Sequence, residues 1–148
     1  MKPIVTVLMT VYNGKNYLNE AIESVLCQTL DNYEFLIVDD ASTDNSIEII
    51  NSYKDSRIKL LKNRENIGQT ASLNEGLAIA QGQYIARFDQ DDVCLPKRLE
   101  DQVAFFKKNP SISILCSREY SIDEQGKRIG IWKRDLNNYG DFLGYIIL

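Results

Sequence analysis

Short apolar runs rich in β-branched and aromatic residues alternate with amphipathic segments over the first 117 residues. We expect strands at residues 4–9, 35–38, 57–61 and 84–88, of which the first two are near-continuously apolar, as in a sheet covered on both faces. Between those two strands, apolar residues recur at helical spacing: Leu18, Ala21, Ile22, Val25 and Leu26. This alternation predicts an α/β fold, in which helices cover both faces of a mostly parallel sheet.

Turn and capping signals divide the rest of the chain. Ser42 or Asp44 suits the start of a second helix, and Gly82 suits the C-cap of a third helix that ends near residue 80. Pro96 fits the first position of a fourth helix, which ends before Asn109. We also expect a fifth strand at residues 112–116 and a hairpin formed by residues 120–123 and 128–132. Near the C-terminus, four residues form an apolar helical stripe: Tyr139, Phe142, Leu143 and Ile146.

Length and composition exclude several classes of function. The 148 residues suit about one domain, and the net charge of −4 with no long basic run argues against a nucleic-acid partner. No histidine is present, which excludes histidine-based acid–base catalysis and histidine metal ligands from this stretch. The three cysteines fit reduced thiols, with Cys27 and Cys116 in the core. No apolar run approaches the roughly 20 residues that span a bilayer.

Polar clusters follow three of the expected strands, at residues 10–13, 39–42 and 89–92. Ligands of parallel α/β sheets bind beyond the carboxyl ends of the strands, so this coincidence predicts a ligand site. In the third cluster, Asp89 and Asp91 are two positions apart and can converge on one point. Two carboxylates with open positions left over suit Mn²⁺ or Mg²⁺ carrying a phosphate. The alternative is a solvated acidic turn that ends the strand.

The kind of ligand follows from what the three clusters can contact. The chain has neither a GxxxxGK[ST] loop nor a GxGxxG turn after the first strand, which disfavours nucleotide binding of the P-loop and dinucleotide-binding types. Asp39 or Asp40 can accept hydrogen bonds from a base or a ribose, and Tyr12 offers a ring for stacking. A divalent cation at Asp91 would offset the repulsion between this acidic site and a diphosphate. The clusters therefore fit a metal-bound nucleoside diphosphate conjugate.

Five blocks in order, over about residues 4–117, resemble the N-terminal half of a family-2 glycosyltransferase with the GT-A, Rossmann-like fold. They read VTVLMTVYN from residue 5, AIESVLCQT from 21, FLIVDDASTDNS from 35, NIGQ from 66, and GQYIARFDQDD from 82 with LPKRL after it. The resemblance implies transfer of a sugar from a nucleotide donor, with a UDP-sugar expected, to an acceptor hydroxyl with inversion. It also implies a role in bacterial surface polysaccharide synthesis, with a saccharide or lipid-linked acceptor.

The resemblance assigns roles to residues of the three clusters. Asp89 and Asp91 resemble the DxD motif, in which Asp89 would contact the donor ribose and Asp91 would ligate Mn²⁺ or Mg²⁺. Asp40 would read the base, with Asp39 beside it, and two further residues would line the base pocket: Thr10 and Tyr12. The family takes its general base from a carboxylate in its second half, so the residue that acts as base here is unknown and expected beyond residue 148.

The same resemblance divides the chain in two. We expect residues 1–117 to form the donor-binding subdomain, and residues 118–148 to form a hairpin and the start of an incomplete acceptor subdomain. The apolar end, residues 146–148, predicts a truncated piece of a longer protein and favours self-association into a homo-oligomer. We expect a cytoplasmic protein, with the inner face of the membrane as the alternative location, and membrane association only through the missing part.

Three other functions compete with transfer. The first is a nucleotide-sugar-binding fragment without turnover. The second is a phosphatase similar to the haloacid dehalogenases, in which Asp89 would be the nucleophile of a DxDx[TV] motif. Only 55 residues follow Val93, which leaves little room for the other residues that such an enzyme needs. The third is a sugar nucleotidyltransferase, which should show a glycine-rich, Arg-containing loop after the first strand. Residues 11–14 do not form one.

Overall fold

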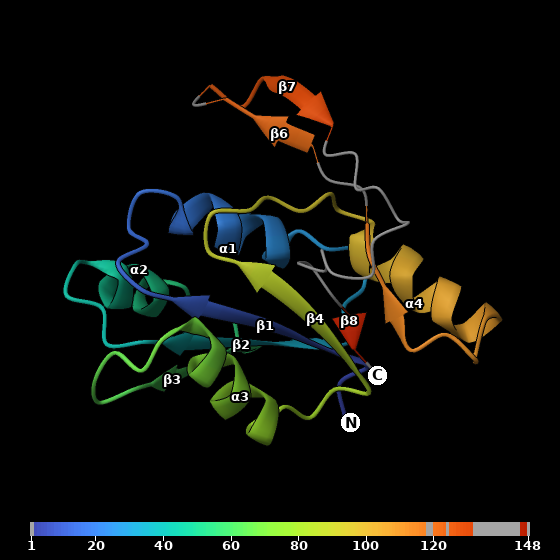
Figure 1. Cartoon of the computed structure of the whole chain (residues 1–148), viewed down its shortest axis with the longest axis horizontal. Helices are drawn as coiled ribbons and strands as arrows, with labels where there is room; N and C mark the ends of the chain where they lie inside the picture. Colours follow the sequence, from blue (N-terminus) through green and yellow to red (C-terminus); the bar gives the residue numbers. More distant parts are fainter. Residues whose placement is uncertain (1, 118–119, 124, 132–145, 148) are drawn as a thin grey trace.

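A computed structural model of the chain describes residues 2–117, 120–123, 125–131 and 146–147. Its main sheet has six strands in the order β3-β2-β1-β4-β8-β5 (Figure 1). The first four strands along the chain are parallel, and β8 runs antiparallel to both of its neighbours. The bounds are β1 (Val5–Val11), β2 (Tyr33–Asp39), β3 (Ile58–Lys62), β4 (Tyr84–Asp89), β5 (Ile114–Leu115) and β8 (Ile146–Ile147). The predicted α/β fold with a mostly parallel sheet is confirmed.

Helices cover both faces of the sheet, as Figure 1 shows for α1 and α3. The described residues form the helices α1 (Leu18–Leu26), α2 (Ser46–Ser52), α3 (Gln69–Ile79) and α4 (Arg98–Lys108). Alternate residues of β1 divide between two cores, because successive side chains of a strand point to opposite faces. Val7 and Met9 lie in the larger core with residues of α1, α2 and α4, whereas Leu8 packs with Leu73 of α3. Among the described residues, no helix is both long and apolar enough to cross a membrane.

Local signals placed the starts of two helices only approximately. The N-cap of α2 is Asn45, so the prediction of Ser42 or Asp44 was wrong. Asp44 accepts the Ser46 N–H at 3.0 Å, whereas Ser42 accepts the Asn13 N–H. The prediction that α4 begins at Pro96 was wrong by two residues. A turn closed by the Arg98 N–H on the Leu95 carbonyl precedes the helix there.

Gly82 does not form the C-cap of α3, because that helix ends at Ile79 and Ala80 is its cap. The glycine is needed for a close approach of chains instead. A Cβ at this position would lie 2.2 Å from the Thr6 backbone nitrogen, and the Gly82 N–H donates to Thr6 Oγ1 at 2.8 Å. The turn before β4 therefore lies directly against β1.

The predicted hairpin is confirmed as β6 (Tyr120–Ile122) paired with β7 (Arg128–Ile131). Three residues of the predicted C-terminal stripe, Tyr139, Phe142 and Leu143, lie outside the described residues. The fourth, Ile146, belongs to β8 rather than to a helix, so the prediction was wrong there. Cys27 is exposed, which corrects its expected place in the core, and Cys116 is half-buried.

The strand order fixes where a ligand can bind. From β1 the chain passes outward to β2 and β3 on one side, and β4 then pairs with β1 on the other side. Such a reversal leaves a crevice at the carboxyl ends of the strands. Thr10 of β1 is in register with Asp89 of β4 and with Val38 of β2. The three predicted polar clusters therefore meet at one edge of the sheet.

Candidate functional site

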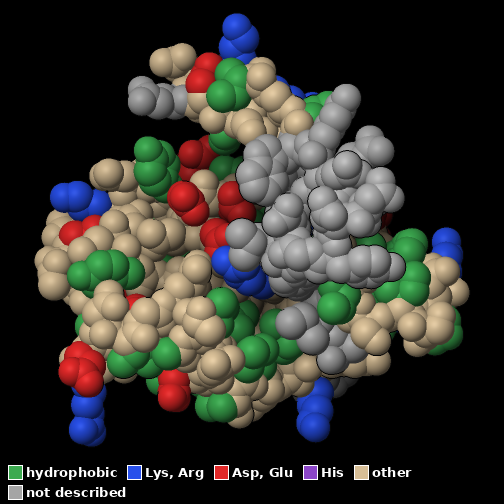
Figure 2. Space-filling view, viewed as in Figure 1, with side chains coloured by type: hydrophobic (Ala, Val, Ile, Leu, Met, Phe, Trp, Pro, Cys, Tyr) green, Lys and Arg blue, Asp and Glu red, His purple; other side chains and the backbone are tan. Residues whose placement is uncertain are grey.

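A cleft of about 620 Å³ opens at this edge of the sheet. Figure 2 shows Asp and Glu side chains gathered in the middle of the viewed face, beside a Lys or Arg side chain. The cleft is lined by eleven residues from the three polar clusters, from β4 and from the start of α3: Thr10, Val11, Tyr12, Asp40, Asn66, Gly68, Gln69, Arg87, Asp89, Gln90 and Asp91. Five of the six residues predicted for the site lie together here.

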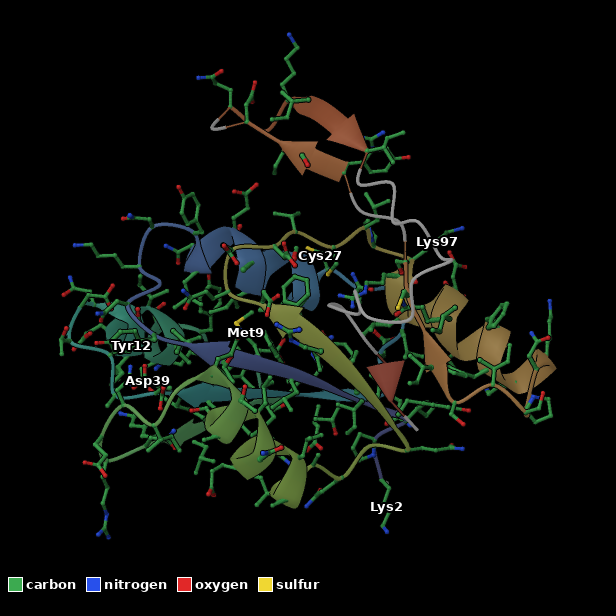
Figure 3. All side chains as sticks on the ribbon, in the orientation of Figure 1. Lys2, Met9, Tyr12, Cys27, Asp39 and Lys97 are labelled. Carbon is green, nitrogen blue, oxygen red and sulfur yellow. The ribbon has the colours of Figure 1, made fainter. Side chains whose placement is uncertain are left out.

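Asp39 is the predicted site residue that does not line the cleft. Val38 packs in the core on the α3 side of the sheet and Ile37 in the core on the other side. Strand alternation therefore places Asp40 on the α3 side, with the cleft, and Asp39 on the opposite side. Asp39 is buried, and its Oδ2 accepts the Ser42 N–H at 3.2 Å. Figure 3 labels Asp39 near Tyr12, at the ends of adjacent strands.

Asp89 forms an ion pair with Arg87, two residues earlier on the same face of β4. The Arg87 Nη2 lies 2.9 Å from Asp89 Oδ1 and 3.2 Å from Oδ2. Gln69 also donates to Oδ1, at a longer 3.4 Å. The Arg87 side chain is largely buried at 16% exposure, and its Nε has no partner among the described residues. The ion pair with Arg87 thus holds the Asp89 carboxylate in place in the cleft and balances its negative charge.

Asp91 differs from Asp89 in having no partner in the part of the chain that the structure describes. Its side chain is exposed, and it makes no hydrogen bond or ion pair with the described residues. The described residues contain no group of three or more acidic or cysteine side chains that could enclose a metal ion. One or two carboxylates with open positions suit Mg²⁺ or Mn²⁺ that takes its other ligands from a phosphate and water. Asp91, with Asp89 beside it, therefore fits such an ion.

Asp40 is buried, and the chain itself supplies hydrogen bonds to its carboxylate. Oδ1 accepts from Asn63 Nδ2 at 2.8 Å and from the Ile67 N–H at 3.0 Å, and Oδ2 accepts from the Gly68 N–H at 2.8 Å. Burial alone would raise the pKa of this carboxyl, but the hydrogen bonds outweigh burial and hold the pKa below its ordinary value. Ser72 also acts on this carboxylate as a side-chain hydrogen-bond partner that lowers its pKa.

The loop after β1 is fixed to the loop after β2 by a set of hydrogen bonds. The Asn13 Oδ1 accepts the Thr43 N–H at 2.8 Å, and Ser46 Oγ accepts the Gly14 N–H at 2.9 Å. Asn13 and Ala41 both have positive φ, at 52° and 60°, which is uncommon for residues other than glycine. Such strained residues cluster at functional sites. Tyr12, at the end of this fixed loop, is 46% exposed and presents its ring beside the cleft.

The sequence reasoning did not assign several residues of the cleft to the site, among them Asn66, Gly68, Gln69 and Gln90. Asn66 and Gly68 belong to the turn before α3 and Gln69 is the first residue of that helix, and nothing in their spacing indicated that this turn packs against the end of β2. The hydrogen bonds from Ile67 and Gly68 to Asp40 bring it there. Gln90 lies between Asp89 and Asp91, the two predicted ligand-binding aspartates. This position in the motif was the one indication in the sequence that Gln90 belongs to the site.

Comparisons with known proteins agree with this geometry. A family model described as Glycosyl transferase family 2 matches residues 6–146. An uncharacterised glycosyltransferase, MJ1057 of Methanocaldococcus jannaschii, is 41% identical over 97% of this chain and 51% of its own. The Escherichia coli UDP-Glc:alpha-D-GlcNAc-diphosphoundecaprenol beta-1,3-glucosyltransferase WfaP is 34% identical over 96% of this chain and 56% of its own.

A solved structure extends the likeness to the fold. S. aureus TarS in complex with UDP superposes with a TM-score of 0.76 at 26% identity, over 85% of this chain and 38% of that one. The chain spans about half the length of the curated relatives it matches. The family match covers nearly all of the chain, and its parallel strands with helices on both faces match the GT-A, Rossmann-like fold. The chain belongs to glycosyl transferase family 2.

Proposed function

We propose that this chain binds the nucleotide-sugar donor, a UDP-sugar, for a metal-assisted inverting transfer to an acceptor hydroxyl. The observation that carries the proposal is the exposed Asp91 carboxylate, which has no partner among the described residues and lines the same cleft as the exposed Tyr12. S. aureus TarS, at 26% identity, has a solved complex with UDP. Bound Mn²⁺ or Mg²⁺ would stabilise the negative charge that develops on the departing nucleoside diphosphate.

The residues of the cleft divide the work of holding the donor. Tyr12 stacks on the base, Thr10 lines the base pocket, and Asp40 accepts the N3–H of uracil. Asp89 accepts a ribose hydroxyl, and Asp91 binds the metal ion. Arg87 holds Asp89 in position through their ion pair at 2.9 Å. Asp39, on the opposite face of β2, holds the loop that follows that strand by accepting the Ser42 N–H.

The acceptor side lies outside this set of residues. We propose that the general base belongs to the part of the relatives' length that this chain does not span. The name of WfaP, at 34% identity, specifies a lipid-linked acceptor, which supports an acceptor of that kind here. Such an acceptor suits synthesis of a surface polysaccharide at the inner, cytoplasmic face of the membrane. The 148 residues by themselves would then bind donor without transferring sugar.

The phosphatase alternative lacks support from the structure. Asp89 ends β4, whereas that motif would lie on the opening strand of the sheet, and its carboxylate is bound to Arg87 rather than free to attack phosphate. The alternative of a fragment that binds the donor without turnover shares this donor site with a transferase. The two differ only in whether the acceptor half of the enzyme is present.

The metal requirement is tested by calorimetry of UDP binding in Mn²⁺ and in EDTA. We expect Mn²⁺ to raise UDP affinity at least about tenfold, because it joins the Asp91 carboxylate to the diphosphate. Asp91→Asn should remove this gain. Glu75→Gln, which neutralises an exposed carboxylate on α3, should retain it. Equal UDP affinity in Mn²⁺ and EDTA for the wild-type chain would contradict the proposal.

The base contact is tested by changing the ligand rather than Asp40, because Asp40 also holds its own loop. Cytosine has an acceptor where uracil has its N3–H, so CDP would meet the carboxylate with a lone pair. We expect CDP to bind about tenfold or more weakly than UDP, the value of a hydrogen bond to a charged acceptor. Equal affinity for the two nucleotides would mean that Asp40 does not read the base.

A further inference from the structure

Gln90, between Asp89 and Asp91, turns its side chain toward the loop after β1. Its Oε1 accepts the Tyr12 N–H at 3.0 Å, and its Nε2 donates to the Tyr12 carbonyl oxygen at 3.3 Å. The pairing of β1 with β4 ends at Thr10 and Asp89. The side-chain amide of Gln90 thus continues the hydrogen bonding between β1 and β4 beyond their last backbone pair. It bonds both the N–H and the carbonyl oxygen of Tyr12.

Gly14 leaves the space that this side chain occupies. A Cβ at residue 14 would lie 2.5 Å from Gln90 Oε1 and 2.9 Å from Gln90 Cδ, closer than real Cβ contacts come. Gly14 is not among the glycines with positive φ, so its backbone does not require a glycine. The close approach of the Gln90 amide is the contact that a larger residue would disturb.

The two loops joined by Gln90 carry the two ends of the proposed donor site. Tyr12 lies on one, and Asp89 and Asp91 flank Gln90 on the other. A nucleoside diphosphate has its base and its phosphates at opposite ends, so it must contact both loops at once. Holding the loops at a fixed separation before binding removes the cost of ordering them during binding.

We propose that Gln90 is a positioning residue that couples the base-binding loop to the metal-binding loop. This inference rests on the proposed function, because it needs a ligand that spans both loops. Its consequence is specific: loss of Gln90 should weaken ligands that reach both loops and spare ligands that reach only one. A residue that merely stabilised the fold would weaken both kinds alike.

The experiment compares UDP in Mn²⁺ with inorganic pyrophosphate in Mn²⁺, which reaches only the metal-binding loop, by calorimetry, for four variants and the wild-type chain. Gln90→Ala removes the hydrogen bonds, and Gly14→Ala displaces the same side chain from the other side. Each should weaken UDP about tenfold, the value of about one hydrogen bond, and pyrophosphate less than about twofold. Gln83→Met, at an exposed residue directly before β4, and Gly130→Ala, which has open space around it, should change neither.

Two further measurements separate this inference from the proposed function. If Gly14→Ala acts through Gln90, it should add no loss of UDP affinity in a Gln90→Ala background, where its Cβ has room. The Tyr12 amide should exchange slowly with solvent in the free wild-type protein and rapidly in Gln90→Ala, whatever the ligand does. The inference is overturned by wild-type UDP affinity in Gln90→Ala, by additive losses in the double variant, or by a Tyr12 amide that exchanges rapidly in the wild type. A wild-type chain that binds no UDP would overturn the proposed function and the coupling with it, even with a protected Tyr12 amide.

Discussion

Replacement of Asp40 by Asn should destabilise the protein strongly, although the two side chains have nearly the same shape. The carboxylate is 2% exposed and accepts three hydrogen bonds, two on Oδ1 and one on Oδ2. An amide has one oxygen. In its better orientation it keeps the donors from Asn63 and Ile67 and turns its NH₂ group toward the Gly68 N–H, which lies 2.8 Å from Oδ2 in the wild type.

The magnitude follows from the bond that is lost and the donor left behind. A hydrogen bond to a charged group contributes about 1.5–3 kcal/mol, and a buried donor without an acceptor costs about 1–3 kcal/mol. We therefore expect Asp40→Asn to lower the free energy of unfolding by about 3–5 kcal/mol at pH 7. Asp91→Asn makes the same chemical change at an exposed carboxylate without partners, and should change that free energy by less than about 0.5 kcal/mol.

The pH dependence gives an independent check. The folded-state pKa of Asp40 lies below its ordinary value of 3.8. The contribution of the ionised carboxylate to the free energy of unfolding is therefore fully present above pH 3.8 and is lost as the pH falls through the folded-state pKa. Urea unfolding of the wild type and Asp40→Asn at several pH values would measure this. The difference in free energy of unfolding between the two proteins should stay constant from pH 7 to about pH 5, and this gap should narrow below about pH 3.8. A gap below about 1 kcal/mol at pH 7, or one that does not narrow in acid, would refute the role given to Asp40.

Two further predictions concern packing and alkaline stability. Gly82→Ala would place a Cβ 2.2 Å from the backbone nitrogen of Thr6, so it should lower the free energy of unfolding by about 2 kcal/mol or more. Gly130→Ala, in open space, should lower it by less than about 0.5 kcal/mol. Thermal unfolding measures both, and equal melting temperatures of the two variants would contradict this. Burial raises the pKa of Tyr33 from 10.0 to about 12. The contribution of the protonated hydroxyl to the free energy of unfolding is therefore fully present below pH 10 and is lost as the pH rises toward 12, by up to about 3 kcal/mol. Tyr33→Phe should remove that part of the alkaline slope in chemical unfolding, and an unchanged slope would show that Tyr33 is not its source.

The parallel core of the fold was accessible from the sequence because its signals are local. Apolar runs marked β1 and β2, and helical spacing marked α1 at its observed bounds of Leu18 and Leu26. The antiparallel strand β8 was not accessible. Ile146 continues a helical spacing from residue 139, and its place between β4 and β5 depends on pairing with strands far away in sequence. The prediction for Gly82 was wrong for a similar reason, since the need for a glycine there comes from the close approach of β1 rather than from the helix before it.

The site was predictable where alternation along a strand decides the outcome. Asp89 and Asp91 were recognised as a pair by their spacing, although the extended chain assumed for them ends at Asp89, where the Asp92 N–H closes a turn on the Asp89 carbonyl. Thr10, Asp40 and Tyr12 were recognised by their place at strand ends. The same rule, applied across the adjacent aspartates, would have separated Asp39 from Asp40, because neighbours in an extended chain face opposite sides. The three partners of Asp40 and the Gln90 amide pairing depend on how loops meet in space, which no spacing in the sequence reveals.

The charges of the cleft argue for a cation as part of the ligand. Three carboxylates and one guanidinium line it, and the ion pair of Arg87 with Asp89 uses that guanidinium. The hydrogen bonds to Asp40 stabilise its charge without cancelling it, and Asp91 is unpaired among the described residues. A diphosphate that approached these two carboxylates at about 5 Å would meet a repulsion of about 3 kcal/mol for each pair of charges at an effective dielectric constant of about 20. In the proposed function a cation offsets this repulsion, and we expect it at Asp91, the cleft carboxylate that has no partner among the described residues.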